Sequence, residues 1–82
     1  MITMKIFSQA GTIFDGMVAH VTFPGEMGRF AVFPMHASIL SNLVQGDIVC
    51  HTANEEKLTF TIQSGFAEVK NNQATACVEL LV

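Results

Sequence analysis

Apolar and polar residues alternate with a period of two in several short stretches of the chain. In residues 57–63, Leu58, Phe60 and Ile62 are separated by threonines. Successive side chains of a β-strand point to opposite faces, so this pattern predicts a strand with one buried and one solvated face. Residues 73–80 repeat the pattern, with one face formed by Ala74, Ala76, Val78 and Leu80.

Turn residues divide the rest of the chain into further strands. Asn71-Asn72 tolerates left-handed backbone, which predicts an antiparallel hairpin between residues 66–70 and 73–80. The polar segment 52–56 predicts a second hairpin between residues 48–51 and 57–63. Four more strands are expected at residues 3–8, 12–14, 17–23 and 29–33, with turns at residues 9–11, at Asp15-Gly16 and at Pro24-Gly25.

Residues 38–43 are the exception among the predicted strands. Residues 38–43 could form a turn of helix, with Ser38 as its cap and Ile39, Leu40 and Leu43 facing inward. No stretch of about twelve residues has helical periodicity. Seven or eight short strands within 82 residues therefore predict an all-β domain, either a β-sandwich or a small barrel.

Composition narrows the class of protein. Half of the 82 residues are apolar, and only 4 basic and 7 acidic residues are present, about half the usual share of charge. This excludes a disordered tail, and the longest apolar run, residues 30–35, is too short for a membrane span of about 20 residues. No basic stretch followed by an apolar core opens the chain, so no signal peptide is expected. A domain this small leaves some apolar surface outside, which suggests a partner.

The charge argues against a nucleic-acid-binding protein, and the cysteine content argues against a disulfide-bonded one. The net charge is −3, and the four cations, Lys5, Arg29, Lys57 and Lys70, are scattered, so nucleic-acid binding is not expected. The chain also lacks Tyr and Trp for base stacking. Cys50 and Cys77 form no Cys-x-x-Cys pair, which favours two free thiols over a disulfide.

The sequence contains no convincing group of residues for catalysis or metal binding. His20 and His51 lack a second ligand at metal-site spacing and are interpreted as solvated or hydrogen-bonded histidines. His36 lies in a loop that is apolar on both sides, where a contact role and a local structural role are both open. No nucleophile elbow or phosphate loop occurs, and Glu55-Glu56 fits a solvated turn. We therefore expect no catalytic residue, cofactor, metal or small-molecule substrate.

A carrier domain is the alternative of another class. Small β domains can carry lipoate or biotin on a lysine at a hairpin tip, and Lys57, after Asn54-Glu55-Glu56, is the candidate. The carrier families have Asp-Lys-Ala or Met-Lys-Met at this point, whereas Lys57 is followed by Leu58.

Several segments together resemble a known family. They are Ile13-Phe14-Asp15-Gly16, Pro24-Gly25, Gly28-Arg29-Phe30-Ala31-Val32-Phe33-Pro34-Met35-His36-Ala37 and Ser64-Gly65-Phe66-Ala67-Glu68-Val69. In order and spacing they resemble the N-terminal domain of the epsilon subunit of the rotary (F-type) ATP synthase, over essentially the whole chain. The departures are Ala31, Met35 and Ser64 in place of glycines, Ser38 in place of a proline, and Arg29 where an acidic residue is frequent. Because a non-glycine residue avoids positive φ, Met35 suggests a different loop backbone.

The resemblance implies a fold and a function. The fold would be a small two-sheet antiparallel β-sandwich of about eight to ten short strands, in one domain over residues 1–82. The domain would be a noncatalytic part of the central rotor that packs on the gamma subunit and on the ring of c-subunits and helps to couple ion flow to ATP synthesis. It would lie peripherally at the cytoplasmic face of the inner (plasma) membrane.

The resemblance also implies contact residues and a difference in regulation. The family's C-terminal helical hairpin is missing from the sequence, so inhibition of hydrolysis by that hairpin is not expected. The residues expected to contact gamma or the ring are Ser8, Gly25, Glu26, Met27, Gly28, Arg29, Phe30, His36, Ala37 and Ser41.

Overall fold

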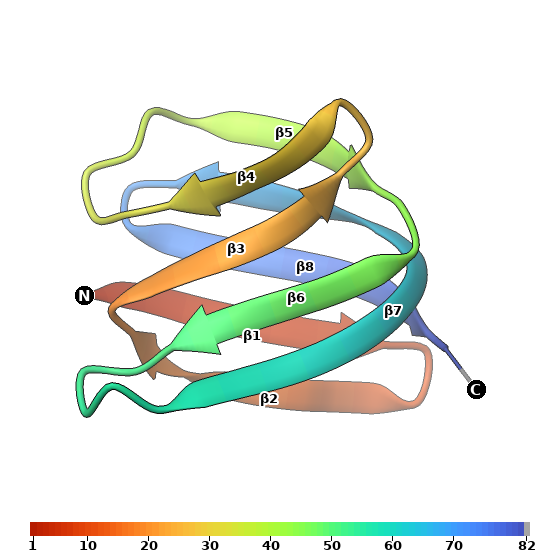
Figure 1. The fold of residues 1–82 in the computed structure, drawn as a ribbon, viewed down its shortest axis with the longest axis horizontal. Helices are drawn as coiled ribbons and strands as arrows, with labels where there is room; N and C mark the ends of the chain where they lie inside the picture. The colour runs from red at the N-terminus through yellow and green to blue at the C-terminus, as the bar shows by residue number, and fades with distance from the viewer. Residues whose placement is uncertain (82) are drawn as a thin grey trace.

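The computed structural model describes residues 1–81, in which eight β-strands follow one another without a helix (Figure 1). The predicted all-β fold class is confirmed. The strands are β1 (Ile2–Ser8), β2 (Gly11–Val18), β3 (His20–Gly25), β4 (Gly28–Val32), β5 (Ile39–Leu43), β6 (Gly46–His51), β7 (Lys57–Lys70) and β8 (Gln73–Leu80).

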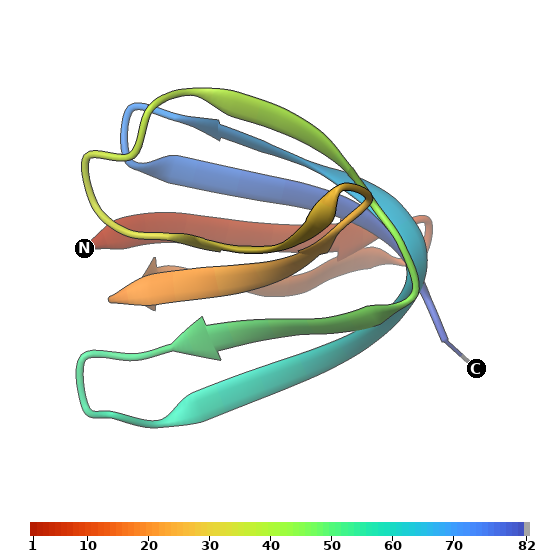
Figure 2. The ribbon, with the colours of Figure 1, turned by 45° about the horizontal axis from the view of Figure 1, so that its top comes forward.

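The strands form two layers that share β7. The first layer has the order β2-β1-β8-β7-β5, and the second layer places β6 between β3 and β7, with β4 beside β3. The first half of β7 pairs with β6, and its second half pairs with β5 and β8. The strand therefore curves from one layer into the other, as the views in Figures 1 and 2 show. A shift of register between Ile62 and Ser64 marks the change, as expected for a bulge that bends a strand.

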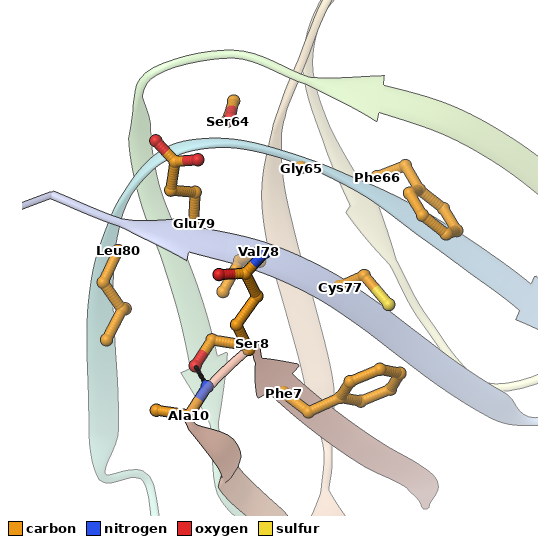
Figure 3. A pocket seen from close by; sticks show the side chains of 11 residues that line it. Phe7, Ser8, Ala10, Ser64, Gly65, Phe66, Cys77, Val78, Glu79 and Leu80 are labelled. Carbon is orange, nitrogen blue, oxygen red and sulfur yellow. Dashed lines mark hydrogen bonds between the residues drawn. The ribbon is translucent and has the colours of Figure 1, made fainter.

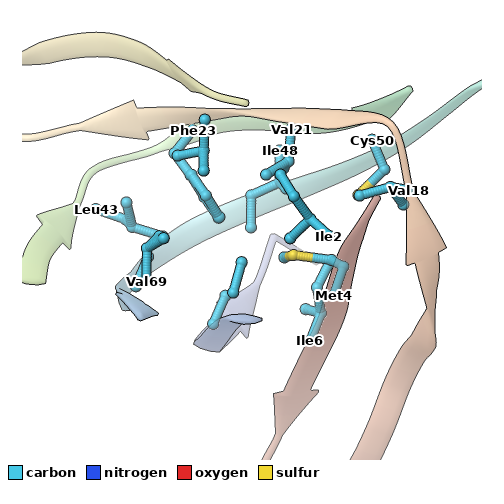
Figure 4. Packing of buried hydrophobic residues seen from close by; sticks show 14 of the residues in the cluster. Ile2, Met4, Ile6, Val18, Val21, Phe23, Leu43, Ile48, Cys50 and Val69 are labelled. Carbon is cyan, nitrogen blue, oxygen red and sulfur yellow. The ribbon is translucent and has the colours of Figure 1, made fainter. Parts of the chain in front are cut away.

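The core lies between the two layers and consists of apolar side chains. Phe23, Val21 and Ile48 of the second layer face Ile2, Met4 and Ile6 of the first (Figure 4). In β1 the alternation is complete, because Ile2, Met4 and Ile6 are buried while Thr3 and Lys5 are exposed. Burial of these side chains supplies the main driving force for folding.

Both predicted hairpins are confirmed, but the strands around them are longer than predicted. Residues 57–63 and 66–70 belong to one continuous strand, because the bulge bends β7 without ending it. Ile62 is fully buried, whereas Leu58 and Leu80 lie at strand ends and are exposed. The first strand pairs with the last in parallel, from Thr3↔Gln73 to Phe7↔Cys77, so this pair departs from the antiparallel prediction.

The predicted helical turn at residues 38–43 is wrong. Residues Ile39–Leu43 form β5, which pairs with β7 from Ile39↔Val69 to Leu43↔Gly65. A helix of this length gains too few hydrogen bonds to offset its nucleation, whereas the β7 edge satisfies the backbone directly. Leu40 therefore points outward and is 71% exposed, instead of facing the core.

Two predicted turns are also wrong. Asp15-Gly16 lies inside β2, where Asp15 pairs with Lys5, and the chain bends instead at Ala19. The predicted strand 17–23 is therefore divided, with Met17 exposed on β2 and Val21 and Phe23 buried on β3. Pro24-Gly25 forms the end of β3, and the turn comes at Glu26-Met27. Proline is tolerated there because the Pro24 carbonyl accepts a hydrogen bond from Val44 N (2.9 Å), a role that requires no N–H of its own.

Candidate partner-contact site

Most of the predicted contact residues lie towards the two ends of the long axis of the domain. The β3–β4 turn and Ser8, at the end of β1, lie towards one end, and the loop of residues 33–38 lies at the other (Figure 1). Strand β4 connects the turn to the loop. Ser41 belongs to β5, where its hydroxyl donates to the Asn42 carbonyl (2.9 Å). The residues predicted as one set therefore form two separate surfaces.

The β3–β4 turn is held firmly at its base and exposed at its tip. Glu26 N donates to the Asn42 carbonyl (2.9 Å), which fixes the turn to β5. Gly25 is buried, and a Cβ there would lie 2.7 Å from Gly28 O and from the Phe30 ring. Gly28 has φ +124°, a conformation that favours glycine. Met27, at the tip, is 96% exposed, so it is the residue of this turn best placed for a partner.

Arg29 and Phe30 hold the hairpin to the rest of the domain. Arg29 Nη1 donates to the Asp47 carbonyl (3.0 Å), so the guanidinium connects β4 to the start of β6. Phe30 packs against Phe23, with ring centroids 5.5 Å apart. Phe30 therefore supports the core, and Arg29 has a structural contact in addition to its exposed surface.

The loop of residues 33–38 contains a tight turn with an unusual residue. His36 N donates to the Phe33 carbonyl (3.2 Å), and Pro34-Met35 occupies the corner. Met35 has φ +68°, as the third residue of a type II turn requires. The expectation that a non-glycine residue avoids positive φ here is therefore wrong. The Asn72 side chain explains how the turn persists.

Asn72 binds the loop from the β7–β8 turn. Its Oδ1 accepts a hydrogen bond from Met35 N (2.7 Å), and its Nδ2 lies 3.7 Å from Met35 Sδ. The Asn72 carbonyl also accepts from Thr3 N (2.9 Å). Next to Met35, half-buried His36 donates through Nδ1 to the Ala37 carbonyl (2.6 Å). His36 therefore has a local structural contact, and its other ring nitrogen remains for a partner.

The other two histidines stack on one another, which the sequence did not predict. His20 on β3 pairs with His51 on β6, and their ring centroids are 4.0 Å apart. Phe33 stacks on His20, with centroids 4.7 Å apart. Partial burial, with the nearby positive charges of His20 and Lys57, lowers the pKa of His51. Only the register of β3 against β6 brings these rings together.

Both cysteines are free, as predicted. Cys50 is buried in the core, and burial raises the pKa of its thiol to about 11. Cys77 is half-buried on the outer face of the first layer. The Cys50 thiol is therefore inert at neutral pH, and Cys77 is the more accessible sulfur.

An apolar groove lies on the outer face of the first layer, a feature that the sequence reasoning missed. Cys77 lies between its strand neighbours Phe7 and Phe66, which flank the sulfur in Figure 3. The groove has a volume of about 700 Å³ and continues past Ser8 and Leu80. Phe66 is 46% exposed. Phe7 and Phe66 occupy the outward-facing positions of their strands, between the positions of the buried residues. Two aromatic residues at outward-facing positions were the signal from which the groove could have been predicted.

Three further features concern metal ions, membrane crossing and the carrier lysine. Within residues 1–81, no group of three His, Cys, Asp or Glu side chains is placed to hold a metal ion. Over the same residues no helix is long and apolar enough to cross a membrane. Lys57 is the first residue of β7, paired with His51, and lies after the tip of the hairpin turn.

Comparisons with known proteins agree on one family. The family model described as ATP synthase, Delta/Epsilon chain, beta-sandwich domain matches residues 1–82. The ATP synthase epsilon chain of Nitratiruptor sp. is 46% identical over 76 residues, and that of Sulfurovum sp. is 37% identical over 76 residues. In both cases the match spans 93% of this chain and 59% of the relative.

The fold also matches a solved structure. The Euglena gracilis mitochondrial ATP synthase, in a structure of its OSCP, F1 and c-ring, contains a chain that superposes with a TM-score of 0.88 at 22% identity. The match covers 94% of this chain and 49% of that one.

Proposed function

Because the chain belongs to the family of β-sandwich domains of the ATP synthase delta/epsilon chain, we propose that it is a noncatalytic part of the central stalk of a rotary ATP synthase. In this proposal the domain packs on the gamma subunit and on the c-ring, and it helps to couple ion flow to ATP synthesis. The family match over residues 1–82 carries the proposal. The complex would hold the domain peripherally at the cytoplasmic face of the inner (plasma) membrane.

The position of the contact residues supports a role between two partners. The exposed Met27 turn and the His36 loop lie at opposite ends of β4, which leaves one end of the domain for each partner. We assign the Met27 turn to the ring and the His36 loop, with Ala37 and Ser41, to gamma. Between them the domain has a close-packed core, and such interiors resist deformation under load.

The proposed role needs no catalytic group. The 81 described residues bring together no metal-binding cluster, and they contain no helix that could act as an inhibitory hairpin. These residues alone are therefore expected to bind their partners without hydrolysing ATP and without hairpin-based inhibition.

Binding of the 82-residue chain to the gamma subunit and c-ring from the same organism tests the proposal. We expect His36→Ala to weaken capture by isolated gamma, and Met27→Glu to weaken capture by the gamma–ring assembly while leaving gamma alone unaffected. Met17→Glu is the control, because Met17 is an exposed methionine on the edge strand β2, outside the turn and the loop. Failure of the folded wild-type chain to bind folded gamma would overturn the proposal.

A further inference from the structure

Three aromatic rings form a continuous stack on the second layer, and one of them, Phe33, belongs to the 33–38 loop. Phe33 stacks on His20 with an angle of 21° between the ring planes, and His20 stacks on His51 with an angle of 13°. His20 and His51 are strand neighbours, with His20 at the start of β3 and His51 at the end of β6. Both imidazoles are half-buried, so each can exchange protons with solvent.

The stack can hold one positive charge more easily than two. Two imidazolium rings with centroids 4.0 Å apart repel one another, whereas a single charge faces a neutral ring. Groups of this kind bind their two protons in separate steps that belong to the pair.

The charged groups on the neighbouring elements do little to relieve that repulsion. Strand β7 contributes Lys57, which pairs with His51 and adds positive charge. Strand β4 contributes Arg29, at the far end of that strand from Phe33 and bonded to Asp47 O. The carboxylates Glu55 and Glu56 lie in the exposed β6–β7 turn. Strand β2, which leads into β3 through Ala19, contributes Asp15, whose strand neighbour is Lys5.

The stack is joined to the loop that carries His36. Phe33 is the first residue of the turn closed by His36 N, so displacement of the Phe33 ring moves the start of the loop. The other anchor is Asn72, through its bond to Met35 N. The loop is therefore held at two points, of which only the ring stack contains ionisable groups.

We propose that Phe33, His20 and His51 form a pH-sensitive latch on the 33–38 loop. With at most one proton on the histidine pair, the three rings stay stacked and the loop is fixed at both anchors. A second proton, taken from solvent by the remaining neutral imidazole, drives the two imidazolium rings apart, and the displaced His20 ring no longer supports Phe33. Of the two anchors, only the Asn72 hydrogen bond to Met35 N then remains. In this latch the loop is ordered at neutral pH and loosened in acid, in the range where histidines titrate.

NMR titration of the 82-residue chain tests the latch without any partner. The chain should carry His36→Gln, because this removes the imidazole of the loop itself. We expect the ring protons of the histidine pair to report two separate protonation steps. The Phe33 ring and Met35 amide signals should follow the lower step. Adding His51→Gln should leave a single step and abolish the acid response of Met35.

A second variant covers the case in which His51→Gln does not fold. Phe33→Leu keeps both imidazoles but removes the ring that joins them to the loop, so the two steps should remain while Met35 no longer follows the lower one. The latch is overturned if the two histidines titrate together in a single step. It is also overturned if the Met35 response is the same with and without the Phe33 ring. Because gamma takes no part, these results are independent of the proposed function.

Discussion

Replacing Gly65 with alanine tests the packing between β7 and β8. Gly65 pairs with Val78 on one side and with Leu43 on the other, in the half of β7 that belongs to the first layer. A Cβ at Gly65 would clash with the Cys77 carbonyl oxygen and lie 3.0 Å from Val78 Cα. Both are backbone atoms of a paired strand, so no side-chain rotation can make room.

The expected cost is large for a domain of this size. Overpacking costs about 1–3 kcal/mol, and a clash with backbone belongs at the upper end, about 3 kcal/mol. The whole domain has a free energy of unfolding of roughly 4–12 kcal/mol if it follows the usual value per residue. For a domain of this length, about 3 kcal/mol corresponds to a fall in Tm of roughly 12–24 °C.

Thermal unfolding followed by circular dichroism measures the change. Gly16→Ala is the matched control, because the nearest atoms to a Cβ at Gly16 belong to the Phe14 ring, at 3.2 Å, and a ring can shift. The control should change the free energy of unfolding by less than about 1 kcal/mol. A fall in Tm of less than about 3–4 °C would correspond to a loss of less than about 1 kcal/mol of unfolding free energy. If Gly65→Ala gives such a small change, the β7–β8 register is wrong.

Three further predictions concern the loop, the core thiol and the histidine pair. Asn72→Gly should lower the free energy of unfolding by about 1 kcal/mol in urea titrations, because Met35 N loses its acceptor. Asn71→Gly, at an exposed neighbour with φ +52°, should change the free energy of unfolding less. If the two variants have equal effects, the Asn72 side chain does not anchor the loop. At pH 8 a thiol reagent should label Cys77 but not Cys50 until the chain unfolds, since burial raises the Cys50 pKa to about 11; rapid labelling of both would contradict that burial. Because the pKa of His51 is lowered in the folded chain, the unfolded chain binds a proton at this residue at a higher pH than the folded chain does. Stability should therefore be intact above about pH 6.5 and fall as the pH drops below it, and His51→Gln should flatten this slope in melts between pH 5 and pH 8.

Local patterns were sufficient to predict the class of fold and both hairpins. The alternation in residues 73–80 and the Asn71-Asn72 turn depend on neighbours in sequence, and both are present as expected. Prediction was wrong where pairing with a distant strand outweighed a local signal. Pro24-Gly25 stays in β3 because β4 and β5 flank it, and residues 39–43 form a strand because the β7 edge is available.

The geometry of the candidate contact site was less predictable, because it depends on residues far apart in sequence. Asn72 binds Met35 across 37 positions, so nothing near Met35 indicates how its positive φ is supported. The stack of His20 on His51 depends on the register of β3 against β6. The sequence could identify candidates such as Met27 and His36, but only the fold places them on two surfaces.

Isothermal titration calorimetry at neutral pH can measure binding of the 82-residue chain to purified gamma subunit of the same organism. We expect a saturable 1:1 complex that is weakened by His36→Ala and unaffected by Met17→Glu. Absence of binding, with both proteins folded by circular dichroism, would contradict the proposed function.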